Sequence, residues 1–302
     1  MNKLLIFLVK RLFEKGDKKR LKKDKAPEGV DFIRNQNYLN DGKNEHCFDV
    51  VFSQNTDKRL PTIFNIHGGA FVSGDKSTYE YYCSRLALKG YAVVNINYGL
   101  APKYVFPSFV SDCAAAINFA CGNAEKYHID TNDYCIVGDS AGGMISAHIA
   151  LISSNPLFAE GFEAKLDFKP KALGLSCAQL DFDGKFTTNK FLKHLNTYFG
   201  KKKKAYPPRK TYDIFENITK DFPPAFLTSC ADDILFSDSL IFEQKLNGAG
   251  VKNKCLFYDE THNPLGHVYN YRWIHNDGRE MPEAAEATNL MIEFFSSVNH
   301  EE

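Results

Sequence analysis

Apolar, strand-like runs alternate with longer helix-like segments along most of the chain. This alternation is typical of an α/β fold with a mostly parallel sheet flanked by helices. No internal repeat is visible, so we expect one continuous sheet. Strands are predicted at 46–53, 61–66, 91–97, 133–138, 171–177, 224–230 and 254–258, with an eighth at a sheet edge over 31–38. Helices are predicted near 77–90, 107–126, 141–154, 237–248 and 282–298.

Two stretches interrupt the alternation. Residues 1–45 are polar and basic, and residues 181–222 lie between two predicted core strands and carry a run of lysines at 201–204. We interpret both stretches as cap elements over the mouth of a pocket, and the lysine run as a solvated loop. The expected organisation is an N-terminal cap segment over 1–45 and one α/β domain over 46–302, with 181–222 as a cap insertion.

The first residues imitate a signal peptide without matching its pattern. Their apolar run ends at Lys10, which makes it shorter than the roughly 7–15 residues of a signal-peptide core. It is also far shorter than the roughly 20 residues of a membrane-spanning helix. Four leucines at helical spacing predict an amphipathic helix instead: Leu4, Leu5, Leu8 and Leu12. This helix could be a lid over a site or could touch a membrane surface, and the basic run 18–25 keeps the second role open.

Charge and cysteine usage narrow the possible partners. The 302 residues carry 37 basic and 37 acidic side chains, so no overall field attracts nucleic acid. Eight cysteines stand singly, with no C-x-x-C and no Cys/His spacing typical of zinc. We therefore expect buried reduced thiols, no metal, and a cytoplasmic location.

The segment Gly138–Gly143 reads Gly-Asp-Ser-Ala-Gly-Gly and follows an apolar run. It has the form of a nucleophile elbow, in which a strand turns sharply into a helix and the serine at the apex is exposed to a base. Gly138 and Gly142 are needed because the backbone passes too close to its neighbours for a Cβ. The pattern predicts Ser140 as a nucleophile.

A second glycine motif lies about 70 residues upstream. His67-Gly68-Gly69 follows the predicted strand 61–66, and an H-G-G segment in this position is typical of the loop that forms an oxyanion hole. Backbone N–H groups of Gly68, Gly69 and Ala141 are expected to stabilise a negatively charged oxygen. The helix beginning at Ala141 adds its positive end.

A serine nucleophile needs a base and an acid that orients the base, and here the acid should precede the base in the chain. The acid is expected on the loop after the strand 224–230, which offers Asp232 and Asp233. Asp238 is expected to cap or begin the next helix. Asp139, beside the serine, is expected to point away from the pocket mouth and to serve the structure.

The base is expected after the last strand, where three histidines are available: His262, His267 and His275. His267 is favoured because it follows Gly266 and leads into an apolar stretch. His262 lies close to the strand end and fits a turn as readily. His262 and His275 therefore remain alternatives.

Together these motifs resemble the hormone-sensitive-lipase-like branch of the α/β-hydrolases, the alpha/beta hydrolase 3 esterases. His67–Phe71 matches its H-G-G motif, and Gly138–Gly143 matches its G-D-S-A-G-G motif. Asn97–Pro102 is similar to its N-Y-R-L-A-P segment. The acid motif D-P-L appears as Asp233-Ile234-Leu235, which selects Asp233 over Asp232, and the base motif H-x-F appears as His267-Val268-Tyr269.

The resemblance covers roughly residues 45–298 and implies a fold, an activity and a cap. It implies hydrolysis of carboxylic esters, usually with short acyl chains, by an acyl-enzyme route through Ser140, His267 and Asp233, without a metal or organic cofactor. Gly99 and Lys103 depart from the usual Arg and Glu, and the acid motif lacks its Pro. These departures concern the surroundings of the site and leave the three expected catalytic residues in place.

Three hypotheses of function follow from this resemblance. The leading hypothesis is a serine carboxylesterase that acts on a small-molecule ester such as an acetyl ester. An amidase such as an arylformamidase is the second, because the same triad cleaves activated amides. A non-catalytic ligand receptor is the third, although receptors of this branch lose the histidine that His267 retains here. A homodimer could pair through the strand 254–258 and the last helix. The sequence does not identify the acyl group or the alcohol.

Overall fold

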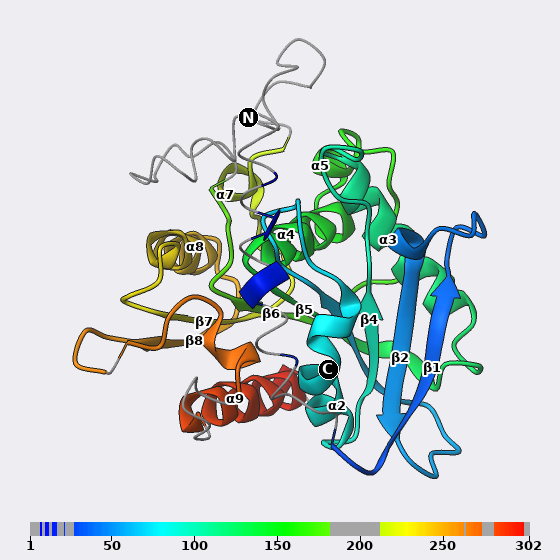
Figure 1. Ribbon diagram of the computed structural model, residues 1–302. Helices are drawn as coiled ribbons and strands as arrows, with labels where there is room; N and C mark the ends of the chain where they lie inside the picture. The colour runs from blue at the N-terminus through cyan, green and yellow to red at the C-terminus, as the bar shows by residue number, and fades with distance from the viewer. Residues whose placement is uncertain are drawn as a thin grey trace.

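The computed structural model describes residues 27–181, 212–262, 264–273 and 281–298, together with positions 7, 10–11, 14–16 and 21 near the N-terminus. Its centre is the sheet that the alternating pattern predicts (Figure 1). The strands are β1 (Val30–Asn37), β2 (Cys47–Ser53), β3 (Leu60–Ile66), β4 (Ala92–Ile96), β5 (Ile129–Asp139), β6 (Ala172–Ser176), β7 (Ala225–Cys230) and β8 (Asn253–Tyr258).

The eight strands lie in the order β1-β2-β4-β3-β5-β6-β7-β8. β2 runs antiparallel to both of its neighbours, β1 and β4. From β4 to β8 every neighbouring pair is parallel. The predicted α/β class and the mostly parallel eight-stranded sheet are therefore confirmed.

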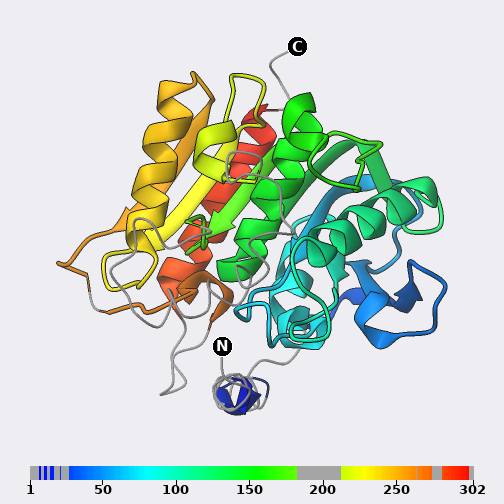
Figure 2. The same ribbon diagram turned by 90° about the horizontal axis from the view of Figure 1, so that it is seen from above.

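Helices cover both faces of this sheet (Figures 1 and 2). One core lies between the sheet and α3, α4 and α8, and the second lies between the sheet and α2 and α9. The helices are α2 (Glu80–Ala87), α3 (Ser108–Gly122), α4 (Ser140–Ser154), α5 (Pro156–Ala159), α7 (Ile214–Asn217), α8 (Phe236–Gly248) and α9 (Pro282–Val298). Among the residues that the structure describes, short 3₁₀ turns are η1 (Asn44–His46), η2 (Lys76–Tyr79) and η4 (Tyr269–Tyr271).

Because helices cover both faces of the sheet, the sequences of the central strands are continuous apolar runs. Successive side chains of a strand point to opposite faces, so a strand covered on both sides buries nearly every residue. Every residue of β4 is buried, and in β3 only Pro61 is exposed. The edge strand β1 instead mixes half-buried and exposed positions, which is why its sequence is more polar.

The structure corrects the expected boundary after residue 45. β1 pairs with β2 along its length, so residues 30–37 belong to the sheet and not to a cap segment. At the end of the expected insertion 181–222, Ile214 and Phe215 are buried in the main core. Residues 182–211 lie outside the described residues, so a cap role for them stays a prediction.

The N-terminal helix prediction falls mostly on residues that the structure does not describe, including all four leucines that suggested it. The described positions there, among them Phe7, Lys10 and Glu14, are helical. Within the described part of the chain, no helix has both the length and the apolar character needed to cross a membrane.

Candidate active site

The parallel strands bring the expected site residues to one edge of the sheet. Gly68, Ser140, Asp233 and His267 stand on the loops or turns that follow β3, β5, β7 and β8. In open α/β sheets this carboxyl edge is where ligands bind, because the strand-to-helix loops there can converge. Residues separated by up to 199 positions in sequence, 68 and 267, line one hollow.

The turn from β5 into α4 has the backbone expected of a nucleophile elbow. Ser140 has φ = +48°, a left-handed conformation that is uncommon outside glycine and is held only by surrounding structure. A Cβ on Gly142 would lie 2.0 Å from the carbonyl oxygen of Ile66, and one on Gly138 would lie 2.5 Å from the carbonyl oxygen of Gly142. The glycines therefore let α4 start directly against β3.

Replacing Gly142 with alanine should destabilise the protein. Its Cβ would overlap rigid backbone, and overpacking of this kind costs about 1–3 kcal/mol, with a clash against main chain at the upper end. Urea unfolding measures the loss. Gly122→Ala is the matched control, because a Cβ at Gly122 meets nothing within 4 Å and should leave the free energy of unfolding unchanged or slightly raised. Equal effects of both substitutions would contradict the close approach.

Ser140, His267 and Asp233 form a connected line of hydrogen bonds. His267 Nε2 lies 3.0 Å from Ser140 Oγ, and His267 Nδ1 lies 2.5 Å from Asp233 Oδ2. The side chain of Asp233 is fully buried, and its Oδ1 accepts the N–H of Leu235 at 2.6 Å. Of the two candidate histidines that the structure describes, His267 is the one that reaches the serine. His262 is exposed and packs on the ring of Tyr258, and His275 lies outside the described residues.

Asp232, the alternative acid, has a different position. Its carboxylate accepts the N–H groups of Leu265 and Gly266, at 3.3 and 2.8 Å, just before the histidine. Asp232 therefore holds the loop that carries His267 and makes no bond to the imidazole. Sequence reasoning missed this role, since it depends on which loop faces the carboxylate.

Asp238 lies in the first turn of α8, as expected, but it does more than begin a helix. Its buried carboxylate accepts the N–H groups of Leu180 and Asp181 at 2.8 and 2.9 Å. The loop after β6 is thereby tied to α8.

Two opposing effects act on the charge state of His267. Burial acts to lower the pKa of the imidazole, because it removes the charged ring from water. The hydrogen bond and negative charge of Asp233, with a further contribution from Cys177, act in the opposite direction and together outweigh burial, so the pKa of His267 is raised above the ordinary histidine value. Asp233 thus makes the ring a stronger base than an isolated histidine.

The amides of the H-G-G loop do not all face the serine. The N–H of Gly68 donates to Asp139 Oδ1 at 2.9 Å, so a side chain of the protein already engages it. Gly69 (φ +113°) and Ala70 (φ +52°) curl the loop and line the hollow. Among the described residues, no backbone carbonyl accepts the N–H group of either one. Ala141 lies in the first turn of α4, where N–H groups have no partner within the helix. Ala70 was not singled out in the sequence, since its amide resembles any other until the loop is folded.

Asp139 anchors this loop. Its Oδ2 accepts the hydroxyl of Tyr79 at 2.9 Å while its Oδ1 holds Gly68. Tyr98 supports the same segment, because its hydroxyl donates to the carbonyl of His67 at 2.7 Å and its ring stacks on that imidazole. The expected structural role of Asp139 matches these contacts.

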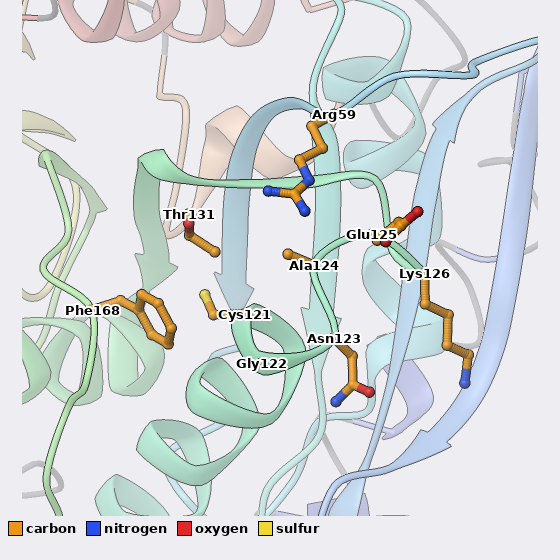
Figure 3. A pocket seen from close by; sticks show the side chains of 9 residues that line it. All are labelled: Arg59, Cys121, Gly122, Asn123, Ala124, Glu125, Lys126, Thr131 and Phe168. Atoms are coloured by element: carbon orange, nitrogen blue, oxygen red, sulfur yellow. The ribbon is translucent and has the colours of Figure 1, made fainter.

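The described residues leave a small hollow beside Ser140, with a volume of about 90 Å³. A larger open hollow of about 640 Å³ lies elsewhere, at the other end of the strands (Figure 3). Its wall includes Thr131 near the start of β5, whereas Ser140 directly follows the last residue of that strand. The larger hollow is therefore remote from the serine.

One set of side chains has the composition of a metal site. Cys177, Asp233 and His267 each offer an atom within 4.8 Å of the other two. A metal would need the thiolate and a free Nδ1. However, burial raises the pKa of the Cys177 thiol, and Nδ1 of His267 is bonded to Asp233. The arrangement therefore fits hydrogen bonding better than metal binding.

Comparison with known proteins agrees with the observed fold. A model of the BD-FAE family matches residues 48–236. The versiconal hemiacetal acetate esterase of Dothistroma septosporum is 27% identical over 207 residues, which cover 65% of this chain and 63% of that relative. Esterase LipI of Mycobacterium tuberculosis is 28% identical over 234 residues, covering 76% and 70%. The crystal structure of esterase B from Lactobacillus rhamnosis has a TM-score of 0.88 at 20% identity, covering 98% of this chain and 94% of that one.

The mostly parallel eight-stranded sheet with helices on both faces is the α/β-hydrolase fold. Since the matching family model extends over more than half of the chain, the chain belongs to the BD-FAE family. The resemblance to hormone-sensitive-lipase-like esterases is confirmed at this level by the esterase relatives. The chain spans just under two thirds of the length of the Dothistroma relative.

Proposed function

We propose that this chain is a serine carboxylesterase that cleaves small esters with short acyl groups. The single observation that carries the proposal is the unbroken line from Ser140 Oγ through the imidazole of His267 to Asp233, with bonds of 3.0 and 2.5 Å. A hydroxyl, a base and a buried orienting carboxylate in this order are the elements of acyl transfer to serine. The short distance to Ser140 also argues against a receptor that has lost its base.

In the proposed reaction Ser140 Oγ attacks the ester carbonyl while Nε2 of His267 accepts its proton. Asp233 holds the proton on Nδ1 and stabilises the imidazolium that forms. The tetrahedral intermediate then expels the alcohol, which takes its proton from Nε2. Water repeats the sequence on the acyl-enzyme, releases the carboxylic acid and restores Ser140.

We assign the oxyanion hole to the amides of Gly69, Ala70 and Ala141. This assignment keeps Gly69 and Ala141 from the sequence and replaces Gly68 by Ala70, because the N–H of Gly68 is bonded to Asp139. Preorganised amides of this kind stabilise the negative oxygen without reorganising, and each is worth about 10²- to 10³-fold in kcat.

Two observations support a short acyl group. The hollow beside Ser140 has a volume of about 90 Å³, room for a small acyl group. In addition, one relative bears the name of an acetate esterase. We further propose a reducing, cytoplasmic location, which the eight free thiols support. Pairing of two copies through β8 and α9 stays a prediction.

A series of p-nitrophenyl esters tests the acyl preference. We expect kcat/KM to be highest for acetate to butyrate and to fall at least 10-fold by octanoate, because a longer chain must leave the hollow or displace its wall. Matched p-nitroanilides measure amidase activity and should be cleaved far more slowly. Equal rates on octanoate and on emulsified long-chain esters would contradict the short-chain proposal, and absence of turnover on every ester would contradict the esterase proposal itself.

A further inference from the structure

Cys177 holds an unusual backbone conformation directly behind the proposed catalytic histidine. It follows β6, is fully buried, and has φ = +44°. A non-glycine residue in this left-handed region is strained, and such strain persists where surrounding structure fixes it. Here the N–H of Cys177 donates to the carbonyl of Thr228 at 2.9 Å. This hydrogen bond fixes the backbone of Cys177 against β7, and so fixes the direction of its side chain.

The sulfur of Cys177 contacts the segment that carries His267. It accepts the N–H of Val268 at a distance of 3.4 Å, and the hydroxyl of Ser229 donates to it at 3.8 Å. Val268 is the residue after the histidine and is itself left-handed, with φ = +62°. The sulfur also lies within 4.8 Å of both the ring of His267 and the carboxylate of Asp233.

These contacts complete a set that holds the histidine from both sides. On the N-terminal side, Asp232 accepts the amides of Leu265 and Gly266, and Cys230 Sγ lies 3.6 Å from the carbonyl oxygen of Gly266. On the C-terminal side, the acceptor for Val268 is the Cys177 sulfur. Without it the amide of Val268 would be buried and unpaired, and the loop would gain by shifting to find another acceptor.

We propose that Cys177 is a positioning residue for His267. The sulfur of Cys177 fixes the backbone after the histidine and lies next to the Asp233–His267 pair. The inference rests on the proposed esterase function. A thiol suits this place because it is a weak donor and a weak acceptor. It pairs with the amide of Val268 and leaves the carboxylate of Asp233 to the imidazole. Burial raises the pKa of the thiol and keeps it uncharged beside that carboxylate.

The test compares Cys177→Ala with Cys177→Ser. Alanine removes the acceptor, so we expect kcat to fall about 10- to 100-fold. This is the effect of moving a catalytic group by up to about 1 Å. KM should change less than threefold. Loosening the contact with Asp233 lowers the pKa of His267, so the acidic limb of the kcat/KM profile moves to lower pH. Serine restores an acceptor and should recover part of kcat and of the shift.

Cys113→Ala is the matched control, because Cys113 is fully buried on α3 in one core of the protein, whereas Val268 lies in the other core. It loses the same sulfur volume and should leave kcat and the pH limb unchanged. If Cys177→Ala keeps the wild-type kcat and limb, or if alanine and serine behave alike while the melting temperature is preserved, the positioning role is wrong.

A readout without turnover separates this proposal from the esterase proposal. The Nδ1 proton of His267, hydrogen-bonded to Asp233, should give a far-downfield proton NMR signal whose pH titration reports the imidazole pKa. We expect that midpoint to fall in Cys177→Ala and not in Cys113→Ala. A wild-type protein that hydrolyses no ester but shows this difference would overturn the esterase proposal alone. An unchanged midpoint in an active enzyme would overturn the positioning role alone.

Discussion

Replacing Ser140 with alanine is expected to lower kcat for p-nitrophenyl acetate by about 10⁵- to 10⁶-fold, the size of effect that loss of a serine nucleophile has in enzymes that use a triad. Nothing else among the described residues next to His267 Nε2 offers a hydroxyl to attack the carbonyl. The residual rate, about 10³- to 10⁴-fold above water, would come from the oxyanion amides and from substrate binding. Steady-state kinetics with the purified variant measure the loss.

Two further measurements make this result specific. An ethyl p-nitrophenyl phosphonate should label the wild type once, at Ser140, and should not label Ser140→Ala, as mass spectrometry would show. Ser84→Ala is the control, because Ser84 is also buried, its Oγ has no hydrogen-bond partner in the described part of the chain, and it lies on α2 on the other face of the sheet. It should retain the wild-type kcat. Retention of more than about 1% of kcat in Ser140→Ala would mean that another group is the nucleophile.

Most of the fold could be predicted from the sequence because strands and turns are determined by residues close together in the chain. A strand buried on both faces must be apolar throughout, so the segments that became β3, β4 and β6 are visible as runs. The elbow was accessible for a related reason. Gly138 and Gly142 are required by contacts within a few residues of the turn and by one strand beside it. Residues 31–38 were expected both as an edge strand and within the cap segment 1–45, because the polar positions of the edge strand β1 resemble the segment before it.

The details of the site were harder to predict from the sequence, because the partner of each hydrogen bond depends on the fold. The glycine motif predicts that amides gather near Ser140, but whether Gly68 or Ala70 faces the oxygen depends on where the carboxylate of Asp139 lies, 71 residues away. Asp232 and Asp233 are adjacent and chemically identical, and only the position of the last loop gives one the imidazole and the other the amides before it. Cys177 carried no signal, since a buried cysteine next to a strand is ordinary.

Asp233→Asn is expected to lower kcat/KM by about 10³- to 10⁴-fold, because the amide cannot hold the proton on Nδ1 of His267 or stabilise the imidazolium. The pH dependence should change as well. The base works in its neutral form, so activity is lost as pH falls below the pKa of His267. Asp233 raises that pKa, so the wild-type acidic limb should lie above the ordinary histidine value of about 6.5. Without the carboxylate, burial dominates and the limb should move to lower pH.

Asp232→Asn separates this electrostatic effect from a disturbance of the loop. The amides of Leu265 and Gly266 bind different oxygens of Asp232, and asparagine keeps one acceptor oxygen and so one of these two bonds. We therefore expect kcat/KM to fall about 10-fold and the acidic limb to stay in place. Both variants lose one carboxylate at neighbouring positions, and the pH profiles of kcat/KM distinguish them. If Asp232→Asn moved the limb and Asp233→Asn did not, the assignment of the acid would have to be reversed. The proposed relay requires the opposite result, since only Asp233 shares a proton with the ring that activates Ser140.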